Sequence, residues 1–248
     1  MPPLGLHMAM ARRIGLELGL SDGYQGEYIL GSTAPDIRVL TKTDRRLTHF
    51  FDLWNFEVQS GRRAMFSEHP EIADAKLLDP ATRAFMTGYL THLEADEAWI
   101  LDIYRPYFGA DSPLAGSSQA NVLDRIIQFE MEQDARADAE AMGESAEALR
   151  RAVLDVECGF LDRETLLRWR EITVDVASRP PDWARFRQVA SRHLKDAGLE
   201  TVEAVDAFME TIPELLEETR RHVSRERLEQ FLEDAHQRSR EAVREYLQ

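Results

Sequence analysis

Apolar side chains recur at helical spacing along most of the chain. The first series predicts a helix over residues 6–20, ended by the turn sequence Ser21-Asp22-Gly23. A short apolar stretch follows, and Pro35 makes residues 32–36 an expected loop or irregular helix junction, because proline lacks a backbone N–H and keeps its neighbour out of the α-helical region. Residues 48–66 are dense in aromatic side chains and predict a helix packed against the core.

The middle of the chain has the strongest helix signals. Asp79 followed by Pro80 is typical of an N-cap and a first helical position, and Pro106 is the next strong breaker, so we expect a helix to about residue 104. Apolar residues occupy nearly every face of this helix, which predicts a buried central position. The remaining expected helices cover about residues 119–141, 145–157, 161–177, 182–196 and 200–247. Pro213 fits a first helical turn better than a helix interior, so the last of these spans is expected to be two helices.

These patterns predict a single all-α domain over residues 1–248, with a helical C-terminal extension from about residue 182. Hydrophobic residues make up 44% of the chain, which is typical of a globular protein with a substantial core. The 13 glycines and 10 prolines are few for 248 residues, as expected for a helix-rich protein.

The net charge of −15 excludes some classes of function. So negative a chain repels phosphate backbones and anionic membrane surfaces, so neither general nucleic-acid binding nor stable membrane association is expected. The first residues lack the basic region and apolar run of a secretory signal. The one cysteine, Cys158, excludes an internal disulfide and fits a reducing compartment, so the expected location is the cytoplasm.

Histidines and aspartates in apolar surroundings are the candidate metal ligands. His92 and Asp96 lie four residues apart and therefore share one face of the most apolar predicted helix. Chance alone gives one or two such pairs, and a structural His–Asp hydrogen bond in the core remains the alternative. Three further polar exceptions, His7, Asp36 and His49, complete an N/O ligand set suited to zinc or a comparable divalent ion.

Four segments in order resemble the zinc-dependent phospholipase C family, which is related in fold to the P1-type nucleases. They are His7, Gly31-Ser-Thr-Ala-Pro-Asp36, Thr48-His49-Phe-Phe-Asp52 and Gly88-Tyr-Leu-Thr-His92-Leu-Glu-Ala-Asp96. The resemblance covers about residues 5–140 and implies a multi-helix, phospholipase C/P1 nuclease-like bundle with its metal core there. It also implies one metal site made by Asp36, His49, His92 and Asp96, with Asp96 bridging to a second ion held by His7.

Members of that family hold a third ion with two downstream histidines and a glutamate, and this chain lacks both histidines. Asp102, Glu130 and Asp134 are the weaker candidates for this position, and an all-carboxylate site would favour Mg²⁺, Mn²⁺ or iron over zinc. Alternatively, the acidic residues 130–147 form a solvated helix face. The expected cofactor is thus one to three divalent ions, with Zn²⁺ as the first choice.

The resemblance implies a metal-dependent hydrolase that acts on a soluble phosphoester or related small metabolite through a metal-activated water. Asp36 is the expected catalytic residue, as a loop-borne general base or water-orienting group. The alternative is a non-catalytic helical protein with a structural metal or none, acting through helix contacts. A broken apolar stripe between Ile212 and Val243 could pack on the domain or form a homodimer. His69, His193 and His236 are expected at the surface.

Overall fold

The computed structural model describes residues 2–20, 23–115, 117–180, 182–183 and 186–248, and it is built from helices. No strand occurs in these ranges, so the predicted all-α class is confirmed. Within the same ranges, no helix combines the length and the apolar character needed to cross a membrane.

The first quarter of the chain forms short helices around one long one. α1 (Leu4–Leu18) matches the first predicted helix and ends at Gly19, whose left-handed φ of 68° closes the last turn. α2 (Gln25–Gly31) follows. The irregular junction predicted around Pro35 is a 3₁₀ turn, η1 (Ala34–Ile37), which continues into α3 (Arg38–Thr41).

The prediction of a helix over residues 48–66 is wrong. α4 (Arg46–His49) ends where Phe50 adopts a left-handed φ of 53°, and α5 (Gly61–Glu68) begins only after its N-cap, Ser60. In the loop between them the Trp54 side chain is 78% exposed. The Arg105 guanidinium lies over the Phe56 ring and donates to two loop carbonyls, so the exposed Phe56 is held by a cation and not by the core.

α6 (Pro80–Trp99) begins as predicted, because the Asp79 carboxylate accepts hydrogen bonds from the first free backbone N–H groups. The helix was predicted to end before Pro106, but the chain continues through this residue as a π-helix, η4 (Ile100–Phe108). The wider π turns accommodate a residue that has no N–H to donate. The fully buried Phe85, Tyr89 and Trp99 confirm that α6 is a central helix.

Most of the rest of the chain is also helical, but residues 152–162 are not, so the helix predicted over about residues 145–157 was wrong beyond Arg151. The last part of the chain holds three helices where two were predicted. The second of these helices ends at His222, because Val223 takes an extended conformation. Ser224 then caps the third, which begins at Arg225. Pro213 lies in a first helical turn, as predicted. The remaining elements are η2 (Pro70–Ile72), η3 (Ala75–Leu77), α7 (Ser118–Ala135), α8 (Ala139–Arg151), α9 (Arg163–Ser178), α10 (Phe186–Val189), α11 (Ser191–Asp196), α12 (Val202–Glu210), α13 (Ile212–His222) and α14 (Arg225–Leu247).

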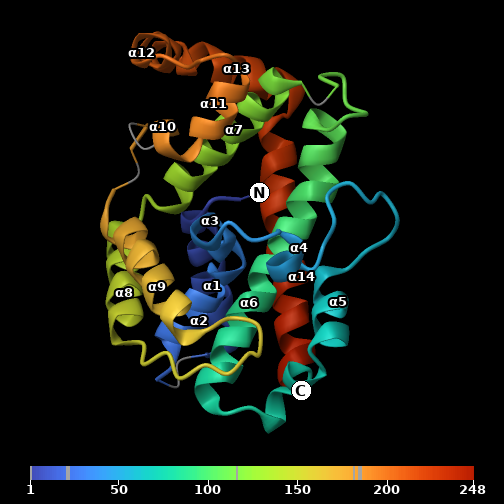
Figure 1. Ribbon diagram of the computed structural model, residues 1–248, viewed down its shortest axis with the longest axis vertical. Coiled ribbons are helices and arrows are strands. Elements are labelled where there is room, and N and C mark those ends of the chain that lie inside the picture. Colours follow the sequence, from blue (N-terminus) through green and yellow to red (C-terminus); the bar gives the residue numbers. More distant parts are fainter. Residues whose placement is uncertain (1, 21–22, 116, 181, 184–185) are drawn as a thin grey trace.

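The two longest helices, α6 and α14, pack lengthwise through the middle of the molecule (Figure 1). α2 packs on α6, with α8 and α9 beside it, whereas α10 to α13 gather around α7 at one end. Ser239 and Tyr246 of α14 donate to carbonyls of Thr91 and Ile72. Much of the apolar stripe of the last helices is buried within the chain, at Ile212, Val223, Phe231 and Val243.

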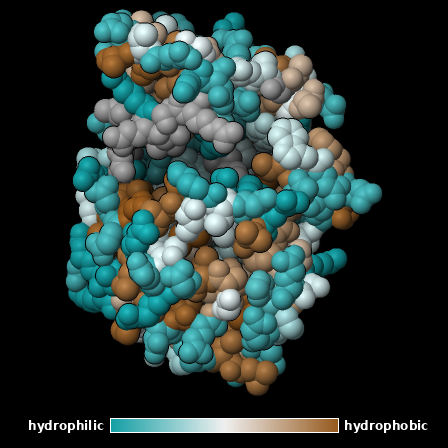
Figure 2. Space-filling model, in the orientation of Figure 1, coloured by the Kyte–Doolittle hydropathy of each residue, from teal (hydrophilic) through white to brown (hydrophobic). Residues whose placement is uncertain are grey.

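The surface visible in Figure 2 carries hydrophobic side chains in small patches between hydrophilic ones. This pattern is typical of a globular protein surface, where single exposed apolar residues need no partner.

Candidate metal centre

Five predicted ligands converge at one buried point. His7 comes from α1, Asp36 from η1, His49 from the end of α4, and His92 and Asp96 from α6. Each side chain is buried. Their donor atoms form two overlapping groups, one of His7, Asp36 and His92 and the other of His49, His92 and Asp96, in which all atoms lie within 4.8 Å of one another.

Close helix packing brings the η1 turn to α6. A β-carbon on Gly88 would overlap the Tyr28 carbonyl oxygen, and one on Gly31 would overlap the Phe85 carbonyl oxygen, so only glycines allow α2 and α6 to approach this closely. As a result the Ser32 carbonyl at the end of α2 lies 2.8 Å from Nδ1 of His92. The glycines thereby place the loop that carries Asp36 next to the α6 histidine.

The hydrogen bonds of the two facing histidines favour one tautomer of each neutral ring. A carbonyl only accepts, so His92 donates through Nδ1–H to Ser32 and keeps a lone pair on Nε2. The Thr48 hydroxyl donates to the Arg45 carbonyl and therefore accepts from Nδ1–H of His49, 3.1 Å away. This also leaves a lone pair on Nε2 of His49. Such outer hydrogen bonds are typical of metal-binding histidines.

The distances between these donor atoms match a metal coordination shell. Zinc–nitrogen bonds of 2.0–2.1 Å in a tetrahedron place neighbouring ligand atoms about 3.3 Å apart. The two Nε2 atoms of His92 and His49 are 3.4 Å apart. Nε2 of His49 is 3.5 Å from Oδ1 of Asp36. With lone pairs on both Nε2 atoms, the two nitrogens repel each other at this distance, and a cation between them would relieve the repulsion.

Three more donor atoms in the cluster have no hydrogen-bond partner among the described residues. These atoms are Nε2 of His7, Oδ1 of Asp36 and Oδ1 of Asp96. The His7 ring stacks on the His92 ring, with centroids 3.7 Å apart, so both belong to the same side of the cluster. Buried polar atoms without partners are costly, and a cation bound in one of the two groups would give such atoms a partner.

The electrostatics of the cluster favour neutral His7 and His49 and ionised aspartates. Burial lowers the pKa of His7 well below its ordinary value and that of His49 to about 4. For Asp36, burial alone would raise the pKa, but the nearby imidazoles of His49, His92 and His7 lower it overall. For Asp96, too, burial alone would raise the pKa, but Arg45 and the nearby imidazoles of His49 and His92 together lower it. These are the protonation states that metal ligands need.

Arg45 is a component of the centre that the sequence did not indicate. Its buried guanidinium forms an ion pair with Oδ2 of Asp96 and donates to the Phe51 carbonyl, 3.1 Å away. It lies between Asp44 and Arg46, which pair with each other at the surface, and nothing in this charged run distinguishes its middle residue. Asp96 therefore keeps one oxygen, Oδ1, for a metal ion.

The weaker candidates lie elsewhere. Asp102 pairs with Arg238 at 3.0 Å, and Glu130 pairs with Arg220. Asp134 is exposed. Neither metal-binding group found among the described residues includes any of the three carboxylates.

Among the histidines expected at the surface, only His236 is buried, and that expectation was wrong. Its side chain is 3% exposed and Nε2 lies 3.2 Å from Glu17, because α14 packs against α1. His69 is half-buried beside Glu71. His193 is also half-buried and borders the cavity described next.

Asp36 also lines a cavity of about 320 Å³. Asp36 belongs both to the cluster and to the cavity wall, so a molecule in the cavity would lie beside the metal ligands. The wall combines apolar residues with arginines and includes Arg38, Arg125, Gln128, Phe129 and Trp169.

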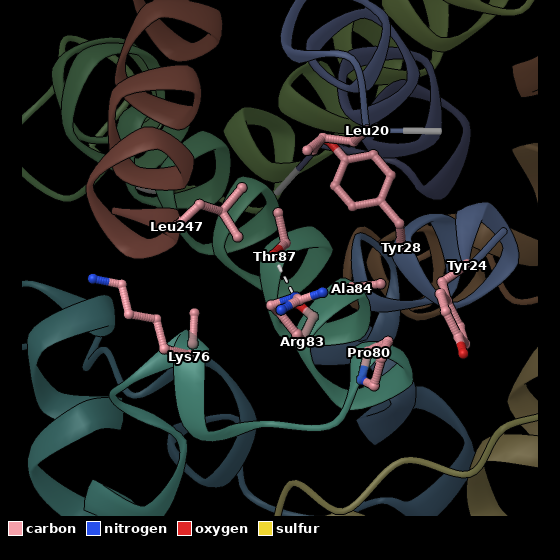
Figure 3. Close-up of a pocket in the computed structure, with 10 residues that line it drawn as sticks. Leu20, Tyr24, Tyr28, Lys76, Pro80, Arg83, Ala84, Thr87 and Leu247 are labelled. Atoms are coloured by element: carbon pink, nitrogen blue, oxygen red, sulfur yellow. Dashed lines mark hydrogen bonds between the residues drawn. The ribbon is translucent and has the colours of Figure 1, made fainter. Parts of the chain in front are cut away.

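A second cavity, of about 230 Å³, lies near the start of α6, and Arg83, Lys76 and Leu247 contribute to its wall (Figure 3). Its wall contains none of the five cluster residues, so this cavity is separate from the metal centre.

Comparison with protein-family models, with curated proteins and with solved structures finds no match to this chain.

Proposed function

We propose that this protein is a metal-dependent phosphoester hydrolase of the zinc-dependent phospholipase C type, in a phospholipase C/P1 nuclease-like helical bundle. The observation that supports it most strongly is the approach of Nε2 of His49 to Nε2 of His92, 3.4 Å apart beside two buried carboxylates. A cation between these atoms would bind both nitrogens and compensate the carboxylates.

The geometry favours one divalent ion. His92 has a single free nitrogen, because Ser32 occupies the other, and both possible groups require it. The Arg45 guanidinium holds the second oxygen of Asp96, where a bridging carboxylate would meet another ion. Imidazole and carboxylate donors suit zinc first, and also Mn²⁺ or iron.

When bound, a divalent ion at this position supplies an activated water at neutral pH and positive charge for the phosphoryl oxygens. In the reaction, a water oxygen bonds to phosphorus, the P–O ester bond breaks, and one water proton ends on the departing alcohol. Asp36 faces the cavity from which substrate would arrive. With its lowered pKa, Asp36 is a weak proton acceptor, so we propose that it orients the water by accepting a hydrogen bond.

A structural metal site is the second candidate, and the burial of all five donors favours it. Structural zinc sites are closed, whereas catalytic ones keep an open position. The cavity at Asp36 is the feature that favours the catalytic proposal over this one.

Elemental analysis of the purified protein tests the metal centre. We expect about one equivalent of metal in the wild type, loss of that metal in His92→Ala, and retention in His222→Ala. His222 is a matched control, because Glu226 follows it by four residues but it lies in α13, away from the cluster. Absence of metal from the wild type would contradict both candidate functions.

Hydrolysis of aryl phosphomonoesters and phosphodiesters then separates catalysis from structure. Asp36→Asn should lower the turnover by a factor on the order of 10² or more, because the attacking water loses the carboxylate that orients it. If metal binds and stabilises the fold but no phosphoester is hydrolysed, the metal is structural.

A further inference from the structure

The cavity beside Asp36 differs in charge from the protein as a whole. The chain carries a net charge of −15, yet the cavity wall holds three arginines against the two acids Asp36 and Glu132. Glu132 is already paired, because it lies 3.5 Å from Arg136 and accepts from the Gly5 N–H. The remaining charge favours an anionic occupant.

Gln128 contributes hydrogen-bond donors at this wall. Its side chain is 1% exposed, and Arg125 donates to its Oε1 at a distance of 2.8 Å. An arginine has no acceptor, so this contact defines which end of the amide is oxygen. The other end, Nε2, has no hydrogen-bond partner among the described residues. A buried NH₂ group without a partner, at the edge of a cavity, is suited to a ligand that brings acceptors.

Arg38, two residues after Asp36 in the chain, adds a second donor group. It follows η1 directly, borders the cavity, and its Nε has no partner within the described part of the structure. Arg136, in contrast, donates to the carbonyls of Val176 and Arg179 and so connects the end of α7 to the end of α9. Gln128 and Arg38 are therefore the groups that a ligand would engage.

The rest of the wall is apolar. Phe129 and Trp169 are both nearly fully buried and border the cavity, together with Val176. The Trp169 indole N–H is taken by the Thr33 hydroxyl, 3.1 Å away, so only the ring surface remains for a ligand. The volume of about 320 Å³ is at the small end of ligand pockets, which favours a compact molecule.

We propose that this cavity is the substrate-recognition subsite and that it selects a small amphipathic anion, namely a soluble phosphoester with one compact apolar group. Gln128 and Arg38 donate to its anionic oxygens, and Phe129 and Trp169 contact the apolar group. The proposal rests on the proposed function for its reaction, but the binding itself can be measured without turnover.

Calorimetric titration with phenylphosphonate, whose C–P bond is not hydrolysed, tests the subsite. We expect saturable binding to the wild type, both with metal and after chelation, and much weaker binding of benzyl alcohol, which lacks the anionic group. Gln128→Leu and Arg38→Gln should each weaken phenylphosphonate binding about tenfold or more, since each removes a donor to a charged acceptor.

Gln133→Leu is the matched control, because it makes the same change on α7 at a residue outside the cavity wall. It should leave binding within about twofold. Equal binding by the wild type and by both cavity variants would overturn the inference, as would loss of all binding on chelation, which would assign the anion to the metal alone. Normal phenylphosphonate binding in a protein without hydrolytic activity would instead overturn only the proposed function.

Discussion

At the residue scale, Arg45 gives the buried carboxylate of Asp96 a permanent cation. A guanidinium keeps its charge at every working pH, so Asp96 is compensated whether or not a metal is bound. For His92 and His49, the partners Ser32 and Thr48 orient the rings but place no positive charge between the two Nε2 atoms. The protein itself thus compensates the charge of Asp96, whereas the two histidines are oriented for an ion that must be added.

Arg45→Met should destabilise the metal-free protein by about 3 kcal/mol, because it leaves a buried charge without its partner. The loss should be smaller in the metal-loaded protein, where a cation still faces Asp96. Urea denaturation of both forms measures the difference. Arg46→Met is the control, since that exposed neighbour pairs only at the surface and its loss should leave the midpoint unchanged. The same loss with and without metal would argue against an ion beside Asp96.

At the element scale, the contact between α2 and α6 determines the geometry of the centre. Gly31 and Gly88 allow two backbones to touch, and this contact aligns the Ser32 carbonyl with His92. The sequence showed both glycines within the segments that resemble the phospholipase family, but it did not show that they pack on each other. They lie 57 positions apart, and only folding joins them.

Gly88→Ala should destabilise the protein by about 1–3 kcal/mol through overpacking, and should weaken metal binding because α2 moves away from His92. Gly143→Ala, in the exposed interior of α8, is the opposite case: its β-carbon meets nothing within 4 Å. There we expect a gain of about 1 kcal/mol, from the better helix propensity of alanine. Thermal denaturation and metal titration measure both. A neutral Gly88→Ala would show that the two helices can separate without cost.

The elements themselves were predictable where their signals are local. The Asp79 cap and the Pro213 first turn involve neighbouring residues, and both are found as predicted. The aromatic density before Phe66 was misleading, because a left-handed Phe50 ends α4 and a cation on a distant helix holds Phe56. Hydrophobic content predicts burial only when a core is within reach, and that depends on the tertiary structure.

At the scale of the whole molecule, α14 makes the C-terminal part of the chain a component of the core. Phe231 is fully buried and contacts the Trp99 ring edge-on, with centroids 5.1 Å apart. Ser239 bonds to the carbonyl of Thr91, the residue before His92. The last helix therefore supports the helix that carries two of the candidate ligands.

Phe231→Ala should lower the free energy of unfolding by about 3–5 kcal/mol, the usual cost of a large cavity in a core. Val202→Ala, at a position in α12 that is largely exposed, should leave stability nearly unchanged. Chemical denaturation followed by tryptophan fluorescence reports on both variants, because Trp99 is the residue that Phe231 contacts. A small effect of Phe231→Ala would mean that α14 folds independently of α6.

The sequence by itself determined the helical class and the five polar residues that stand out in apolar surroundings. Periodicity, caps and the cost of a buried charge are local properties, readable one segment at a time. Only the tertiary structure decided that those five residues meet, that Arg45 joins them, and that Gln128 and Arg38 border the cavity beside Asp36. These contacts join distant parts of the chain, and their geometry depends on helix packing, which no single segment encodes.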